Sequence, residues 1–321
     1  MLVLKKREAW VDWSKTILIF LMVLGHNNLP GFEHTWIYGF HMPAFFIISG
    51  YLFKPRSWKL TIKGLFIPIA VFSIVRFCFY VLNQSVKGSM LWDWSLIGRC
   101  LLPFLKANVD NEVTLFTGVW FLMCLLFCRF LCGDVLGRLS KKWIFSIGVV
   151  SLLYMGIESY YTFTQVVNDW FLYRTIACLP FFCFGIMWKK SGKELKISMI
   201  FFVGLLVIYN IMVFKQGYIE MYSGDFGENY ILAFIVALCG SLALFMFSTK
   251  LPYKEISIVY STGTLFILGF HKIFINIFEI LGGRYLKSTC IFSLLYTAII
   301  MVICYYPIKF CMKKAPWLLG K

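Results

Sequence analysis

The 321 residues are 60% hydrophobic and only 14% charged, with a mean hydropathy of +0.79. A chain of this composition cannot cover itself with polar surface in water, which excludes a soluble globular protein and predicts an integral membrane protein. The net charge of +16 would fit a nucleic-acid partner, but the basic residues are dispersed over short segments beside apolar runs. Such segments are typical of loops that flank an anionic bilayer, so we expect the lipid bilayer and no nucleic acid as partner.

Ten apolar runs that are long enough to cross a bilayer follow one another along the chain. We expect helices near residues 14–32, 36–53, 61–82, 113–132, 143–162, 170–188, 197–214, 229–248, 258–281 and 288–311. With a cytoplasmic N-terminus, more than two thirds of the 31 lysines and arginines fall on the cytoplasmic side, loop by loop. The prediction is an all-α integral membrane protein of about ten transmembrane helices, with both termini cytoplasmic, in the plasma or inner membrane.

No separate soluble domain is expected, because the longest polar stretch is only residues 83–112. Residues 1–321 are therefore predicted to form a single membrane domain, one bundle of helices with an internal cavity. The eleven cysteines mostly lie inside apolar runs, where thiols behave as small apolar side chains. We expect them to pack in the core, with no structural disulfide and no metal site.

The first predicted helix carries ionisable residues along one face. Lys15 and His26 are eleven positions apart, which on an α-helix means about 16 Å of rise and about 20° of rotation. Asp12 lies three residues before Lys15, where it can pair with that lysine or orient it. A histidine within hydrocarbon usually faces a protein interior or a wet cavity, so His26 is the first candidate for a functional side chain.

Other ionisable residues are predicted at similar depths on four further helices. These are His41, Arg76, Arg174, His271 and Lys272. Such groups rarely face lipid, so we expect them to converge on one internal cavity. An imidazole that accepts a proton from a hydroxyl, beside fixed cations that stabilise an oxyanion, suits acyl transfer. Proton-coupled transport uses the same residue types, and the residues alone leave both readings open.

Several motifs together resemble the membrane-bound acyltransferase family 3, in the branch similar to fucose 4-O-acetyltransferases. The first is a basic residue and a histidine with ten residues between them, here Lys15 and His26, followed by FHMPAFFIISGYLF. Further matches are VWFL at residues 119–122, the pattern of Arg174, Pro180, Phe181, Phe182 and Gly185, and the histidine of FILGFHKIF, His271. Many relatives have arginine at the position of Lys15. The resemblance implies an O-acyltransferase that moves acetyl from acetyl-CoA to a hydroxyl of a cell-surface or exported glycan.

The resemblance and the predicted topology assign roles to individual residues. The acetyl-CoA donor is expected at the cytoplasmic side, beside Lys15, Asp12, Lys54, Arg56 and Lys59. His26 is predicted to be the general base, while Arg76, Arg174 and His271 orient the acceptor or stabilise negative charge. A glycan or lipid-linked saccharide acceptor is expected to enter from the outer side, past Glu33, His34, His41, Glu112 and Trp120.

Two other functions stay open as alternatives. The first is a proton-coupled transporter or flippase of a small or lipid-linked saccharide. The second is a polysaccharide-assembly scaffold whose site has decayed.

Overall fold

A computed structural model describes residues 8–27, 29–86, 119–161, 171–193, 198–282 and 289–321. Over these ranges the chain is helical, apart from turns and one isolated antiparallel bridge between Glu220 and Asp225. The α-helices are α1 (Ala9–Gly25), α2 (Gly31–Tyr38), α3 (His41–Tyr51), α4 (Trp58–Val86), α6 (Val119–Arg129), α7 (Lys141–Tyr161), α8 (Phe171–Ser191), α9 (Met199–Gln216), α10 (Tyr230–Thr249), α11 (Glu255–Thr262), α12 (Thr264–Gly282) and α13 (Cys290–Lys314). A π-helical turn, η2 (Phe130–Asp134), follows α6, and a 3-10 turn, η4 (Pro316–Leu319), follows α13.

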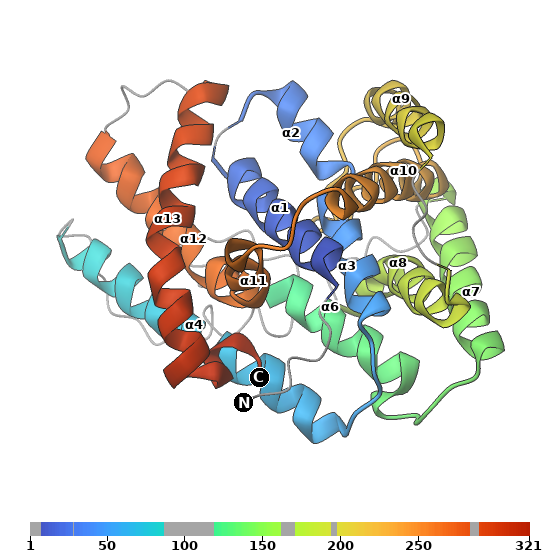
Figure 1. Cartoon of the computed structure of the whole chain (residues 1–321), viewed down its shortest axis with the longest axis horizontal. Coiled ribbons are helices and arrows are strands. Elements are labelled where there is room, and N and C mark those ends of the chain that lie inside the picture. Colours follow the sequence, from blue (N-terminus) through green and yellow to red (C-terminus); the bar gives the residue numbers. More distant parts are fainter. Residues whose placement is uncertain (1–7, 28, 87–118, 162–170, 194–197, 283–288) are drawn as a thin grey trace.

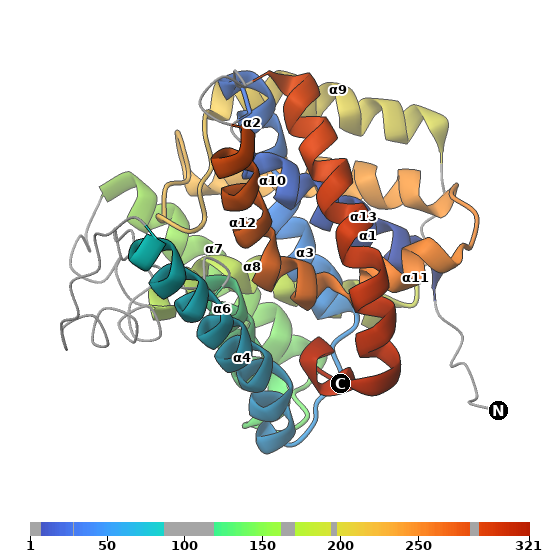
Figure 2. The ribbon, with the colours of Figure 1, turned by 90° about the vertical axis from the view of Figure 1, so that its left-hand side faces the viewer.

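Helix α1 is central and packs against α3, α10, α11, α12 and α13 (Figure 1). At one end of the molecule, here called the α2 end, lie α2 and the last turn of α1 (Figure 2). At the opposite end, the η4 end, η4 packs against α4. Helix α1 therefore lies between α3 and α10 on one side and α11, α12 and α13 on the other.

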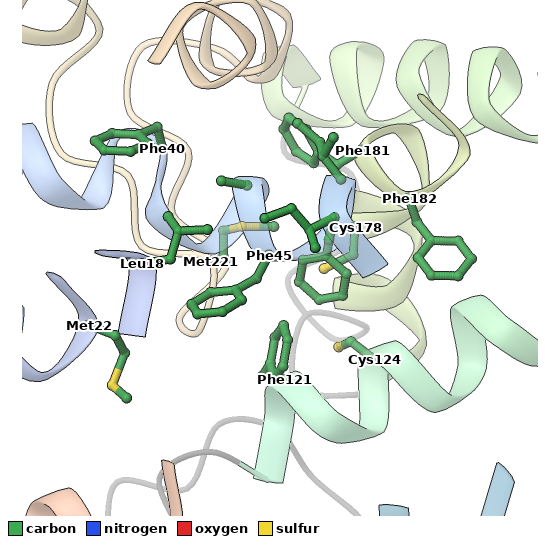
Figure 3. Close-up of a cluster of buried hydrophobic side chains, with 14 of the residues drawn as sticks. Leu18, Met22, Phe40, Phe45, Phe121, Cys124, Cys178, Phe181, Phe182 and Met221 are labelled. Atoms are coloured by element: carbon green, nitrogen blue, oxygen red, sulfur yellow. The ribbon is translucent and has the colours of Figure 1, made fainter. Parts of the chain in front are cut away.

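The core is filled by aromatic rings and thiols between α3, α6 and α8. Phe121 of α6 lies 5.9 Å from Phe45 and 5.0 Å from Phe46 of α3, measured between ring centroids. Figure 3 shows Cys124 and Cys178 beside these rings. Both thiols are fully buried, and they fill space that larger side chains would overfill.

Helices α3 and α8 approach each other backbone to backbone, because each has a glycine at the contact. A Cβ atom on Gly50 would lie 2.0 Å from the carbonyl oxygen of Phe182. A Cβ atom on Gly185 would lie 2.0 Å from the carbonyl oxygen of Ile47. Small residues that permit such close contact are typical of helix interfaces in membranes.

The structure confirms an integral membrane protein built from helices. Helices α4, α7, α9, α10 and α13 are long and apolar enough to cross a bilayer, and the bent pair of α11 and α12 qualifies as a sixth span. In the described part of the chain, α1, α3 and α6 have 17, 11 and 11 residues, fewer than the about 20 that a straight span needs. The expected count of about ten spans, the orientation of the termini and the single-domain assignment stay predictions.

Two expected helix boundaries were wrong, for identifiable local reasons. The first helix ends at Gly25 rather than near residue 32, because Pro30 lacks an N–H and disfavours helical backbone at the residue before it. The expected helix 36–53 is divided, since α2 ends at Tyr38 and α3 begins at His41. Pro43 lies in the first turn of α3, where a helix tolerates proline.

The ninth expected helix is also divided. Between α11 and α12 the chain bends by 76° at Gly263, inside the run that was predicted to be one helix. A Cβ atom at Gly263 would lie 2.4 Å from the side chain of Ile308 of α13, so a larger residue there would displace that side chain. The bend turns α12 toward the end of α1.

Candidate active site

Two histidines from opposite ends of the sequence stack on each other at the centre of the site. His26 caps the C-terminus of α1, and His271 lies in α12. Their ring centroids are 5.1 Å apart and their planes are inclined by 27°. His271 is completely buried, whereas His26 is half-buried. His26 was expected within the first helix. The structure places it just after the last turn of α1.

The His271 ring has a defined orientation. Its Nδ1 lies 3.1 Å from the carbonyl oxygen of Ile267 and 2.9 Å from that of Leu268. Carbonyl oxygens can only accept hydrogen bonds, so Nδ1 carries a proton. In the neutral ring the lone pair then belongs to Nε2. Nε2 of His271 is therefore chemically able to accept a proton or a hydrogen bond.

Lys15 meets the bend between α11 and α12. Its ammonium Nζ donates a 2.5 Å hydrogen bond to the carbonyl oxygen of Ser261, in the last turn of α11. The last carbonyls of a helix have no partner within the helix and carry partial negative charge, so they attract a cation. Thr16 adds a 3.1 Å hydrogen bond to the carbonyl oxygen of Ser257, and Asp12 is buried one turn earlier on α1.

The expected donor-side residues Lys54, Arg56 and Lys59 are exposed at the η4 end, in and after the connection between α3 and α4. A carboxylate that the sequence reasoning overlooked, Asp134, fixes this connection. It accepts a 2.9 Å hydrogen bond from the backbone N–H of Arg56 and a 2.5 Å hydrogen bond from Thr61.

Asp134 also forms an ion pair with Arg129 at the end of α6. The Arg129 Nε atom lies 2.8 Å from Oδ2 of Asp134. The same guanidinium donates to the carbonyl oxygen of Lys54 and lies 4.8 Å from the centroid of the Phe53 ring. The ordered connection thus leaves the side chains of Lys54, Arg56 and Lys59 at the surface.

Four residues were expected along the path of the acceptor, and the structure gives them different positions. His41 is buried, and its Nδ1 lies 2.9 Å from the carbonyl oxygen of Ile37, so it ties α3 to α2 across the break. Glu33 is half-buried on α2, and Trp120 is buried on α6 with its ring 6.3 Å from that of Tyr222. Glu112 lies outside the described residues.

The two predicted arginines are placed differently. Arg76 belongs to α4, but its side chain lies outside the described part of the structure. Arg174, in α8, is only 1% exposed, and its Nε donates to the carbonyl oxygen of Tyr222. Tyr222 belongs to residues 217–229, here called the α9–α10 loop. Arg174 thus fixes a loop at the α2 end. This hydrogen bond does not involve either histidine of the pair.

A group of rings around His26 was not predicted. The Tyr38 hydroxyl lies 3.5 Å from Nδ1 of His26. The Tyr38 ring lies 4.0 Å from that of His34 and 5.4 Å from that of Tyr218, between centroids. The sequence signal was present in FEHTWIY and in QGYIEMYSGDFGEN, which mix aromatic and acidic residues between apolar runs.

Two groups in this cluster have perturbed proton affinities. Burial lowers the pKa of His34, and the nearby carboxylate of Glu220 offsets part of that effect. Burial raises the pKa of the Tyr218 hydroxyl, and the nearby carboxylate of Glu220 raises it further. At neutral pH, His34 is therefore largely uncharged and Tyr218 remains a phenol.

Among the residues that the structure describes, no three His, Cys, Asp or Glu side chains are grouped so that they could hold a metal ion. The thiols of Cys132 and Cys183 lie 3.8 Å apart between η2 and α8, as part of the packed core.

Comparison with known proteins assigns the chain to a family. A family model described as "Acyltransferase domain" matches residues 8–309. Nodulation protein NolL of Sinorhizobium fredii (strain NBRC 101917 / NGR234) is 28% identical over 202 residues, which cover 59% of this chain and 50% of the relative. The chain thus spans about half the length of this curated relative, and no solved structure matches it. Because the family match covers nearly the whole chain, the protein belongs to acyltransferase family 3.

Proposed function

We propose that the protein is a transmembrane O-acyltransferase that moves acetyl from acetyl-CoA to a hydroxyl of a cell-surface or exported saccharide. The contact between His26 and His271 carries the proposal, because it joins the family's helix-one histidine to a second imidazole of defined orientation. The family match supports acyl transfer.

In the proposed reaction, the acceptor oxygen attacks the thioester carbonyl and its proton passes to His26, the general base. The tetrahedral intermediate then collapses, the carbon–sulfur bond breaks, and coenzyme A leaves as a thiol after taking up a proton. A base in this position typically contributes about 10²–10⁴-fold to the rate. The stacked ring of His271 supports His26 and, through the lone pair of Nε2, accepts a hydrogen bond in the site.

The donor is proposed to bind from the η4 end. Lys54, Arg56 and Lys59 are exposed there and attract the phosphates of coenzyme A. Helix α1 ends just before His26, and Lys15 and Asp12 lie along it. The positive charge of this end also favours a cytoplasmic orientation, and hence a cell membrane location with both termini inside.

The test is to replace His26 by alanine in a strain that lacks the chromosomal gene. We expect O-acetylation of surface carbohydrate, measured by mass spectrometry, to be lost while the amount of protein in the membrane stays near that of the wild type. A Glu255→Ala variant, at an exposed residue of α11, is the control for the effect of an alanine substitution itself. Unchanged O-acetylation in His26→Ala would remove His26 as the base.

Transport is the second candidate, and the 76° bend between α11 and α12 favours it, because broken helices form the binding sites of many transporters. Flux of a saccharide across sealed vesicles without any acyl donor is the discriminating measurement. Rapid flux together with no consumption of acetyl-CoA would support transport, whereas acetyl-CoA consumption without flux would support the enzyme.

A further inference from the structure

The α9–α10 loop, at the α2 end, is held in a defined conformation by hydrogen bonds. The backbones of Glu220 and Asp225 pair through hydrogen bonds of 2.8 and 3.1 Å. The side chain of Gln216 is fully buried and donates to the carbonyl oxygens of Phe226 and Asn229. Arg174 of α8 donates a hydrogen bond to the carbonyl oxygen of Tyr222. A loop fixed by two buried polar side chains presents its exposed residues in a defined geometry.

Side chains alternate along the first part of this loop. Ile219 and Met221 are buried, whereas Tyr218, Glu220 and Tyr222 are half-buried. Ile219 and Met221 belong to the hydrophobic core and so anchor the loop. Tyr218 faces a ring of α2, and Tyr222 faces a ring of α6.

Tyr218 and Glu220 connect the loop to the catalytic histidine. The Tyr218 ring stacks on His34, with centroids 5.1 Å apart and planes inclined by 19°. Tyr38 lies against both rings and brings its hydroxyl to 3.5 Å from His26. The Glu220 carboxylate lies close enough to the Tyr218 hydroxyl to raise its pKa. A molecule that rests on this loop therefore lies within a few side chains of His26.

The charge of this surface differs from that of the rest of the protein. Although the chain has a net charge of +16, residues 29–38 and 217–229 contain only acidic formal charges, on Glu33, Glu220, Asp225 and Glu228. His34 adds no full positive charge, because burial lowers its pKa. Two cations lie beside these four carboxylates, Lys215 in the last turn of α9 and the buried Arg174, so the surface carries carboxylates without a strong net charge. It suits a neutral polyhydroxylated ligand.

We propose that the α9–α10 loop is the acceptor-binding element of the enzyme, and that Tyr218 and Glu220 select a neutral saccharide. The Tyr218 ring offers an aromatic face for the C–H face of a pyranose, and the Glu220 carboxylate accepts hydrogen bonds from its hydroxyls. In this arrangement Arg174 is a positioning residue, because it acts on the acceptor only through the backbone of Tyr222. The inference rests on the proposed function, since it names the acceptor site of that reaction.

Saccharide binding tests the inference directly. The full chain in lipid nanodiscs is applied to an array of immobilised neutral pyranosides that differ in the configuration of single hydroxyls. We expect Glu220→Gln to weaken binding of the preferred saccharide by about tenfold, because hydrogen bonds to a charged group are stronger than those to an amide. Tyr218→Leu should weaken binding of all pyranosides, through loss of the aromatic face. Glu228→Gln, an exposed carboxylate of the same loop, is the matched control and should bind like the wild type.

Three results would overturn the inference. They are unchanged affinity and preference in both Glu220→Gln and Tyr218→Leu, an equal loss in Glu228→Gln, and no binding of any pyranoside by the wild type. If one of the two test variants does not fold, as judged by size-exclusion chromatography, the other decides.

Transfer of radiolabelled acetyl from acetyl-CoA by the wild type is measured separately. Binding that depends on Glu220 without any acetyl transfer would refute the proposed function and retain the loop as a saccharide site. Acetyl transfer to a saccharide at wild-type rate and half-saturation in both test variants would refute the inference alone.

Discussion

The ammonium group of Lys15 lies 2.5 Å from the carbonyl oxygen of Ser261, at the point where α11 ends and the chain bends into α12. Eleven positions further along α1, His26 stacks on His271, which is ten positions beyond Ser261. The segment from Lys15 to His26 therefore contacts the α11–α12 pair at two points. These points are eleven positions apart on this segment and ten positions apart on the pair. The spacing between the basic residue and the histidine thus matches the geometry that brings the two imidazoles together.

Replacing Lys15 by methionine should disturb the histidine pair through this bend. The Ser261 carbonyl would lose a charged donor, which costs about 1–3 kcal/mol of stability. We expect a lower thermal unfolding midpoint and a lower kcat in Lys15→Met, with both largely restored in Lys15→Arg. A variant that raises only the KM for acetyl-CoA and keeps the unfolding midpoint would instead indicate that Lys15 contacts the donor.

His271 can be tested separately as a ring and as a nitrogen base. His271→Phe retains an aromatic ring against His26 but removes Nε2, whereas His271→Ala removes both and leaves a cavity in the core. We expect both variants to lose at least about 100-fold in kcat, because neither retains the Nε2 atom that accepts a hydrogen bond in the proposed site. Only His271→Ala should also lower the unfolding midpoint. Near-normal turnover in His271→Phe would limit His271 to packing.

The apolar runs of the sequence predicted the helices well and the breaks within them poorly. The apolar runs marked nearly every helix, because burial in lipid requires a long stretch of apolar residues whatever the neighbours are. At the bend, Gly263 packs closely against Ile308 of α13, and no local pattern in the sequence reports that contact. The break before His41 was easier to predict from the sequence, since Gly39 and Pro43 both lie near it.

The candidate site was predictable where a family motif or an unusual residue in hydrocarbon marked it. His26 and His271 were chosen for these reasons, and the structure brings them into ring contact. Tyr38 and Glu220 were missed, because tyrosine is common at membrane interfaces and a loop acid is usually solvated. Arg174 was chosen as a buried charge, but its contact with the backbone of Tyr222 could not be read from the sequence.

Asp134 should be essential for the order of the connection between α3 and α4. Its side chain is fully buried and pairs with Arg129, Thr61 and the backbone of Arg56. Asp134→Asn leaves the Arg129 guanidinium without its counter-charge, and we expect a loss of about 3 kcal/mol in the free energy of unfolding. The matched control is Glu255→Gln, which breaks an exposed ion pair with Lys309 and should leave the thermal midpoint unchanged. Equal midpoints for the two variants would contradict a structural role for Asp134.

The contact between α3 and α8 should be intolerant of a single added methyl group. A Cβ atom at Gly185 would lie 2.0 Å from a carbonyl oxygen of α3, so Gly185→Ala must push the two helices apart. Because His41 begins α3 and Arg174 lies in α8, the displacement reaches the α2 end as well as the core. We expect a sharply reduced yield of folded protein in detergent, measured by fluorescence-detected size exclusion.

Gly204→Ala in α9 is the control for this substitution, since its Cβ atom would meet nothing within 4 Å. Alanine is favoured over glycine in a helix interior by about 0.5–1 kcal/mol, so this variant should be as stable as the wild type or slightly more stable. If Gly185→Ala accumulated as well as Gly204→Ala, the backbone approach of α3 and α8 would not be required for folding.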